Sequence, residues 1–258
     1  MLKSTKHLAL ATLMVVTLSS CGGSGGNFNL ISLEEEWQLG QQLSQDIARQ
    51  MRVSQDPYLT ELGNKLVRQT SMANLPFNFY VVQDPSINAF AIPGGHVYVH
   101  SGLIDAASNA SELAGVLAHE INHVVARHST EQISRQYGLS VLAGAVLGQN
   151  PAAYQQILAQ VLAGGALARF SREAENEADE LGLQAMVGAG YNPTGMVTMF
   201  QKLLTERRNR PSAVEQFFST HPLTEDRITN IQNRITRMGA RANAVTDEPG
   251  FRSLKSRV

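Results

Sequence analysis

The sequence contains a single cysteine among its 258 residues, Cys21, so an intrachain disulfide is excluded. Charged residues make up only 17% of the chain, and their signs nearly cancel at a formal net charge of −1. Nucleic-acid binding needs clustered lysine and arginine, so this composition argues against a nucleic-acid partner. The length is that of one globular domain with a sizeable core.

The N-terminal segment is apolar but short. Residues 8–18 follow Lys3 and Lys6, which is the layout of a secretory signal. The run is too short for a bilayer span, which needs about 20 residues. It ends in LSSC, which resembles the lipobox of bacterial lipoproteins, where cleavage occurs just before the cysteine. We therefore expect residues 1–20 to be a lipoprotein signal peptide.

Cys21 is then expected to carry lipid and to anchor the chain to a membrane. A buried structural thiol is the alternative, but Cys21 lies between an apolar run and GGSGGN, which offers little to pack against. Residues 21–31 are interpreted as a glycine-rich tether. No aspartate follows Cys21, and by the same resemblance this favours a periplasmic protein held at the outer membrane.

Helix-start signals and β-branched runs predict an α+β fold that is mainly helical. Ser32 with Glu35 forms a capping-box pattern, and Asp56-Pro57 and Asn109 are further start signals. Helices are expected over 32–52, 57–71, from 109 through the HEINH motif, over 171–190, from 193, and over 224–237, with a helical hairpin in 139–168. A strand is expected over 78–83 and a β-hairpin over 88–103. Residues 240–258 show no periodicity and are predicted to be a disordered tail.

Residues 119–123, HEINH, match the pattern H-E-x-x-H. Because residues four apart lie on one helix face, His119 and His123 are placed side by side. Glu120 stands about 100° away, beside that face. This spacing suits one Zn²⁺ held by two imidazoles, with a carboxylate in reach of an activated water. Two surface histidines on a helix are the alternative, but the flanking residues are largely apolar.

His128 is not expected to bind the metal. It follows His119 by nine residues, which on a continuous helix is about half a turn away from the ligand face. Metzincins place a third histidine six residues after the second and break the helix at a glycine, whereas residues 124–127 contain no glycine. We expect His128 to cap or pack the helix end.

The third ligand must come from elsewhere in the chain. In SREAENEADELG, residues 171–182, Glu175 and Asp179 are four apart and share a helix face. Charge-rich helices are often only solvated faces, so spacing alone does not select the ligand. The competing acids are Glu173, Glu177 and Glu180.

Four ordered blocks resemble one family. HEINH, followed some fifty residues later by FSREAENEAD, is similar to the HtpX/BepA-type zinc endopeptidases of metallopeptidase family 48. NAFAIPGG, from residue 88, resembles the family's strand and turn beside the cleft, and HPLTEDR, from residue 221, resembles its H-P-x-x-x-x-R signature. The similarity covers roughly residues 32–238. It implies a gluzincin-like metalloprotease domain, here taken as residues 32–239, in a small lipid-anchored periplasmic member without tetratricopeptide repeats.

The resemblance also implies roles. His119, His123 and Glu175 would bind one zinc ion per chain, and Glu120 would be the catalytic acid and base. Asp179 would accept a hydrogen bond from a ligand imidazole. His221 would stabilise the oxyanion or occupy the fourth zinc position at rest; without the resemblance it is an ordinary loop histidine. Arg227 would order the His221 loop or contact substrate, with a plain helix-surface arginine as the alternative.

The expected function is zinc-dependent hydrolysis of peptide bonds in unfolded or misassembled envelope proteins. Residues 88–91, including Asn88, Ala89 and Phe90, are predicted to form an edge strand that an extended polypeptide joins by backbone hydrogen bonds. An ordinary sheet strand is the alternative for this segment. For the whole protein, the alternative is a chaperone-like lipoprotein that binds clients through a domain whose zinc site is self-inhibited or inactive.

Overall fold

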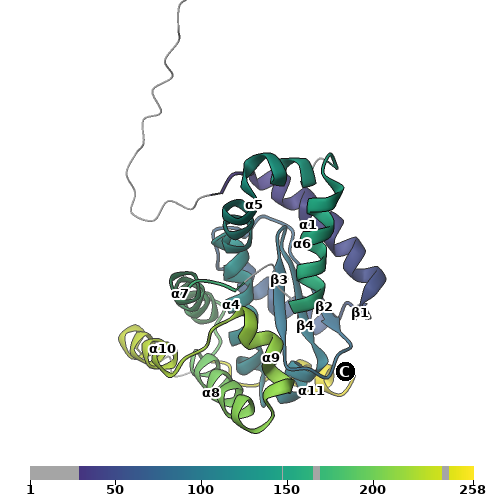
Figure 1. Cartoon of the computed structure of the whole chain (residues 1–258). Coiled ribbons are helices and arrows are strands. Elements are labelled where there is room, and N and C mark those ends of the chain that lie inside the picture. Colours follow the sequence, from purple (N-terminus) through teal and green to yellow (C-terminus); the bar gives the residue numbers. More distant parts are fainter. Residues whose placement is uncertain (1–28, 147, 165–168, 240–243) are drawn as a thin grey trace, which may run out of the picture.

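The structure is a computed structural model and describes residues 29–146, 148–164, 169–239 and 244–258 (Figure 1). The predicted signal peptide, Cys21 and most of the predicted tether lie outside these ranges. The helices are α1 (Leu33–Gln50), α2 (Pro57–Val67), α3 (Ser101–Ala106), α4 (Ala110–Val125), α5 (His128–Val146), α6 (Pro151–Gly164), α7 (Arg172–Gly188), α8 (Thr194–Asn209), α9 (Pro211–Thr220), α10 (Glu225–Met238) and α11 (Pro249–Lys255). The strands are β1 (Val53–Ser54), β2 (Asn78–Val82), β3 (Ala89–Ile92) and β4 (His96–His100).

Helix starts follow the local signals in the sequence. Ser32 and Glu35 form the complete capping box at α1, and the Asp56 side chain accepts from two backbone N–H groups at α2. The side chains of Asn109, Ser171 and Thr224 cap α4, α7 and α10 in the same way. Each cap satisfies backbone donors that have no partner within the helix, which fixes where the helix begins.

The sheet has the order β1-β2-β4-β3. The predicted hairpin is confirmed, since β3 and β4 pair antiparallel, with Ala89 opposite Val99. Gly94 has φ 82° in the turn between them, a conformation that glycine adopts without strain. β2 pairs with β4 in parallel, and β3 therefore forms one edge of the sheet.

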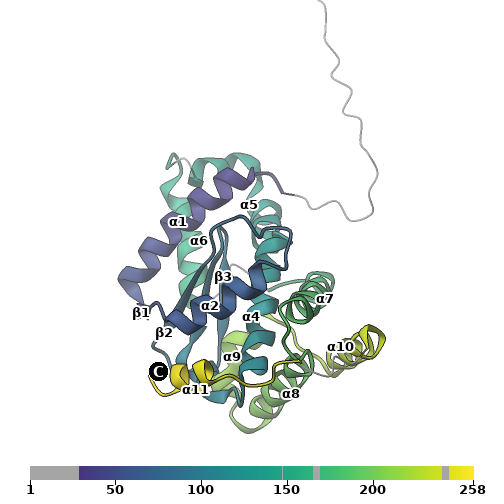
Figure 2. The ribbon, with the colours of Figure 1, turned by 180° about the vertical axis from the view of Figure 1, so that it is seen from behind.

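The sheet lies between two apolar cores. Side chains alternate across a strand, so Val97 and Val99 enter one core while Tyr98 enters the other. The first core contains α2, α4 and α8; the second contains α1, α5 and α6. Figure 1 shows α6 crossing the sheet on one side, and Figure 2 shows α2 crossing it on the other. The α+β, mainly helical fold and the helical hairpin of α5 and α6 are confirmed.

Three expectations are corrected. α2 ends at Val67 rather than near Ser71, and the chain continues in turns. In addition, helix α9 was not predicted from the sequence. The tail predicted to be disordered instead forms α11 in its described part, because Phe251 and Leu254 are buried in the first core. The domain boundary predicted at residue 239 therefore leaves out apolar side chains that pack with the domain.

The close contact between α4 and α8 gives a prediction about stability. A Cβ on Gly115 would lie 2.7 Å from the backbone Cα of Met196. We expect Gly115→Ala to lower the free energy of unfolding by about 1–3 kcal/mol in urea denaturation, because α8 has to shift. Gly188→Ala is the matched control, since its Cβ meets the movable end of the Gln69 side chain. Equal stability of the two variants would contradict the close packing described here.

Candidate metal centre

Helix α4 carries three of the predicted site residues into the interior. His119, Glu120 and His123 are each at most 1% exposed. The helix is buried along nearly its whole length and packs against α7, α8 and β3. The alternative of two surface histidines is therefore wrong, and a buried helix of this kind needs partners for its polar side chains.

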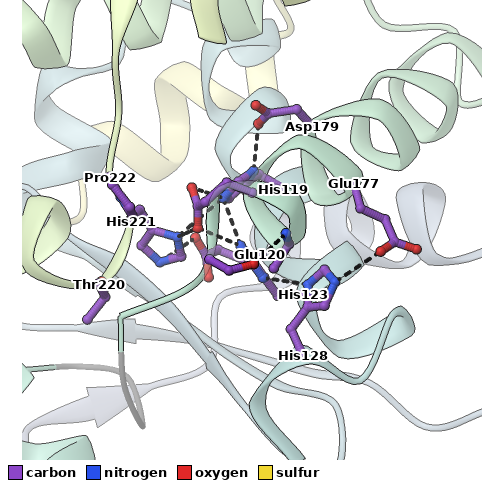
Figure 3. Close-up of polar contacts among 12 residues, drawn as sticks. His119, Glu120, His123, His128, Glu177, Asp179, Thr220, His221 and Pro222 are labelled. Atoms are coloured by element: carbon purple, nitrogen blue, oxygen red, sulfur yellow. Dashed lines mark hydrogen bonds and ion pairs between the residues drawn. The ribbon is translucent and has the colours of Figure 1, made fainter. Parts of the chain in front are cut away.

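Glu175 and His221 join the two histidines. One nitrogen or oxygen from each of His119, His123, Glu175 and His221 lies within 4.8 Å of the others. His119 Nε2 is 3.0 Å from His123 Nε2 and 3.3 Å from His221 Nδ1. Glu175 Oε1 is 3.3 Å from His123 Nε2 and 3.1 Å from His221 Nδ1. Figure 3 shows His119, His123 and His221 side by side, although His221 comes from a different part of the chain than the other two.

The donor set fits zinc. Zinc favours histidine nitrogen and carboxylate oxygen at about 2.0–2.2 Å, so the ligand atoms of a tetrahedral site lie about 3.3 Å apart. The four separations given above are 3.0–3.3 Å, at or just below that value, and all the donor atoms lie within 4.8 Å of one another. In addition, two ring nitrogens facing each other at 3.0 Å are both satisfied by a cation between them. The expected metal, zinc, thus matches the residues present.

A buried ion-pair network lies behind the donors. His119 Nδ1 is 2.9 Å from Asp179 Oδ1, and Arg227 donates two hydrogen bonds to the same carboxylate, from Nε at 2.9 Å and from Nη2 at 2.8 Å. Nη1 of Arg227 also donates to Glu175 and, at 3.2 Å, to the carbonyl of Pro222. Asp179 thus contacts a candidate ligand from behind, and the alternative of a surface arginine is wrong because Arg227 is 5% exposed.

The charges in this network lower the pKa values of both buried acids. Burial alone would raise the pKa of Glu175, but His221, His123 and Arg227 outweigh burial and hold the pKa well below its usual value. For Asp179, burial is likewise outweighed by Arg227 and His119, so its pKa is lowered. Both carboxylates are therefore anionic at neutral pH. Glu175 needs this charge to bind a metal, and Asp179 needs it to accept a hydrogen bond from the imidazole of His119.

Glu120 stands beside the donor cluster. Burial raises its pKa above the usual value; the charges of His221 and His119 and a hydrogen bond from the Ala91 backbone act in the opposite direction. Its Oε1 lies 3.4 Å from His221 Nε2, and in the described part of the chain both atoms are buried without a hydrogen-bond partner. A carboxylate at the cluster with a free oxygen is suited to moving a proton.

Two aromatic contacts were missed in the sequence reading. Phe170 stacks on the His123 ring, with centroids 3.9 Å apart, and Phe217 stacks on His221 at 5.1 Å. His128 was predicted to cap or pack the end of the HEINH helix. It is instead the first residue of α5, and its Nδ1 lies 2.9 Å from His123 Nδ1. Phe170 opens the FSREAENEAD block, but its stacking on His123 depends on long-range packing and was not predicted. No sequence signal separates Phe217 from other apolar residues.

The predicted substrate strand lies beside the site. β3 is at the sheet edge and packs against α4, and the Ala91 backbone contacts Glu120. The Asn88 side chain lies 3.4 Å from Gln216 of α9, and Ala89 is buried in the first core. Phe90 stacks on Tyr98 in the second core, so its side chain serves packing.

An H-E-x-x-H helix whose two histidines are joined by a glutamate from a second helix defines the gluzincin-like class of metallopeptidase domains. The chain belongs to peptidase family M48, whose model matches residues 53–235. Peptidases of this family use zinc, in agreement with the donor set.

Individual relatives support this assignment. The beta-barrel assembly-enhancing protease of Yersinia pestis is 35% identical over 242 residues, covering 87% of this chain and 49% of that protein. The protein of the same name from Escherichia coli K12 is 33% identical over 257 residues, covering 94% of this chain and 51% of the relative. The mitochondrial metalloendopeptidase OMA1 of Schizosaccharomyces pombe is 33% identical over 215 residues, covering 80% of this chain and 62% of the relative. The chain thus spans about half the length of the two bacterial relatives.

Proposed function

We propose that this protein is a zinc-dependent endopeptidase that cleaves unfolded or misassembled proteins of the cell envelope. The observation that carries the proposal is the convergence of His119, His123 and Glu175 beside a buried carboxylate, Glu120. In this proposal the three residues hold zinc, and Glu120 is the general base. When bound, zinc supplies a Lewis acid that polarises a carbonyl oxygen and lowers the pKa of a coordinated water to about 7.

The chain's own residues would move the protons. Glu120 accepts a proton from the attacking water and returns it to the leaving amine. Asp179 holds the Nδ1 proton of His119, which directs the Nε2 lone pair toward the donor cluster. Arg227 donates hydrogen bonds to both acids and to the carbonyl of Pro222, next to His221. Its proposed role is to order the His221 loop.

His221 is proposed to act in two states. Its Nδ1 lies among the donor atoms of the cluster, which supports a resting state in which it takes a fourth ligand position. Catalytic zinc sites keep one position open, whereas structural sites are closed. Withdrawal of His221 would therefore open the site and leave its ring free to donate a hydrogen bond to the oxyanion.

The proposed substrate is an extended polypeptide. The edge position of β3 and the contact of Ala91 with Glu120 support binding by backbone hydrogen bonds along the Asn88–Ala91 segment. Such binding tolerates many sequences, as protein quality control requires. The relatives named as beta-barrel assembly-enhancing proteases support substrates from the envelope and a periplasmic location.

The proposed anchor is lipid on Cys21 at the outer membrane, which rests on the lipobox-like LSSC. None of the helices within the described ranges is both long and apolar enough to cross a bilayer. The alternative function, a client-binding lipoprotein with a silent zinc site, is favoured by one observation, namely that His221 completes a set of four donors.

Metal removal tests the proposed function. We expect the purified protein to contain zinc, to digest casein, to lose this activity after chelation, and to regain it with zinc but not with magnesium. Magnesium is the matched control because it prefers oxygen ligands in octahedral geometry. Undiminished cleavage by the metal-free protein would contradict the proposal. Binding of unfolded casein without cleavage by the zinc-loaded protein would favour the client-binding alternative.

A further inference from the structure

His123 has a partner at each ring nitrogen. Its Nε2 faces the donor cluster, while its Nδ1 lies 2.9 Å from His128 Nδ1. The other nitrogen of His128, Nε2, lies 3.3 Å from Glu177 Oε2 on α7 (Figure 3). His128 is 4% exposed, whereas the Glu177 side chain is 53% exposed. A buried imidazole therefore connects a candidate ligand to an acid at the surface.

The positions of the protons along this connection are interdependent. A metal ligand must present a lone pair, so when His123 Nε2 is the ligand atom, its proton is on Nδ1. His128 Nδ1 then has to accept, which requires that His128 carry its own proton on Nε2. The Glu177 carboxylate, which only accepts, favours this arrangement.

The two candidate ligands on α4 are thus supported differently. His119 Nδ1 contacts the buried carboxylate of Asp179 directly, at 2.9 Å. His123 has no acid at its Nδ1 but reaches Glu177 through His128. Both arrangements place a carboxylate at the end of the hydrogen-bond path, and such groups behind a ligand imidazole fix its tautomer and raise its basicity.

A specific backbone turn places His128 there. Arg127 has φ 59°, the left-handed conformation, which costs a residue other than glycine about 1–2 kcal/mol. Arg127 is held by Glu36, 2.7 Å from its Nε, and by the carbonyl of Ile31, 2.8 Å from its Nη2. The turn ends α4. On a continuous helix His128 would point away from the ligand face, whereas after this turn its ring packs against that of His123.

We propose that His128 and Glu177 are positioning residues that fix the tautomer of His123 and thereby set the affinity of the site for zinc. The inference rests on the zinc site of the proposed function and extends it. Neither residue touches the donor atoms of the cluster; they act through His123. In the sequence, Glu177 was only a competitor of Glu175 for the metal. It lies two residues after Glu175 on α7, about 200° round the helix, and so faces His128 instead of the donor cluster.

Zinc affinity measured by competition with a chromogenic chelator tests the proposal. His128→Phe keeps a ring against Phe170 but removes both nitrogens. We expect it to bind zinc about 10–100-fold more weakly than wild type, the usual effect of losing such a partner. Glu177→Ala should weaken zinc binding more than Glu173→Ala, the matched control, which removes an exposed acid from the same helix. Zinc affinities of His128→Phe and Glu177→Ala equal to that of Glu173→Ala would overturn the proposal.

A spectroscopic readout separates hydrogen bonding from packing. In ¹⁵N NMR spectra of the zinc-loaded full chain, we expect the proton of His128 on Nε2 and that of His123 on Nδ1. A proton on His128 Nδ1 would overturn the proposal. If His128→Phe does not fold, the Glu177→Ala comparison and the NMR measurement still decide the question. Neither readout, zinc affinity or tautomer, needs a substrate. Failure of this proposal is therefore distinguishable from failure of the proposed function, in which the wild type would not bind zinc or would not need zinc for cleavage.

Discussion

Replacing Glu120 by glutamine should slow proteolysis strongly and leave zinc bound. Glutamine has nearly the same shape as glutamate, but its amide does not accept a proton, so the general base is lost. Such a loss typically lowers the rate by about 10²–10⁴-fold. The expected result is a casein-digestion rate reduced by this factor, with an unchanged zinc content measured by atomic absorption.

The fold should tolerate this change. Glu120 is 1% exposed and burial raises its pKa, so a neutral side chain costs less to bury than a carboxylate. Glu215→Gln is the matched control, since it makes the same chemical change at an exposed position of α9. If Glu120→Gln digests casein as fast as Glu215→Gln does, Glu120 is not the general base and the proposed mechanism is wrong.

Removing the Arg227 guanidinium is expected to have the largest effect on stability. Arg227→Met leaves Glu175 and Asp179 buried without their shared cation. Breaking a buried ion pair in this way costs about 3–5 kcal/mol, because an uncompensated charge remains in the interior. We expect this loss in the free energy of unfolding of the zinc-free protein, measured by urea denaturation. The zinc-free protein is used because a bound zinc ion would compensate for part of the missing positive charge.

A second arginine on α10 provides the control. Arg234 pairs with Glu180 at the surface, where the two side chains are 31% and 45% exposed. Exposed pairs contribute about 0–1 kcal/mol, so Arg234→Met should be nearly neutral. Arg227→Lys should lie between wild type and Arg227→Met, because lysine keeps the charge but not the fork that contacts both carboxylates. Equal stability of Arg227→Met and Arg234→Met would show that the buried network does not stabilise the fold.

Local features of the fold were predictable because they depend on interactions within one or two helix turns. The capping box of Ser32 and the side-by-side placement of His119 and His123 are of this kind. The α9 helix and the packed tail were not predictable in this way. The side chains that hold the tail, such as Phe251, contact parts of the chain far away in the sequence.

In the candidate site too, local features were predictable from the sequence and long-range contacts were not. Spacing identified the His119 and His123 pair but left five acids between 173 and 180 undecided, and only the resemblance to a family selected Glu175. The position of His128 was misjudged from helical geometry, because the helix ends at a left-handed turn at Arg127. That turn is held by Glu36, 91 residues earlier in the chain. Long-range ion pairs of this kind leave no periodic signal in a sequence.

The burial of the donor cluster has a consequence for enzyme kinetics. With His119, Glu120, Glu175 and His221 each at most 1% exposed, no polypeptide reaches them in this conformation. In the proposed function, peptide capture therefore requires an opening step. The apparent dissociation constant then equals the intrinsic one divided by the fraction of open molecules. A protein with about 1% of its molecules open would bind peptide about 100-fold more weakly than its open form does. If the proposed function holds, only peptides present near or above this raised dissociation constant would then be cleaved at an appreciable rate.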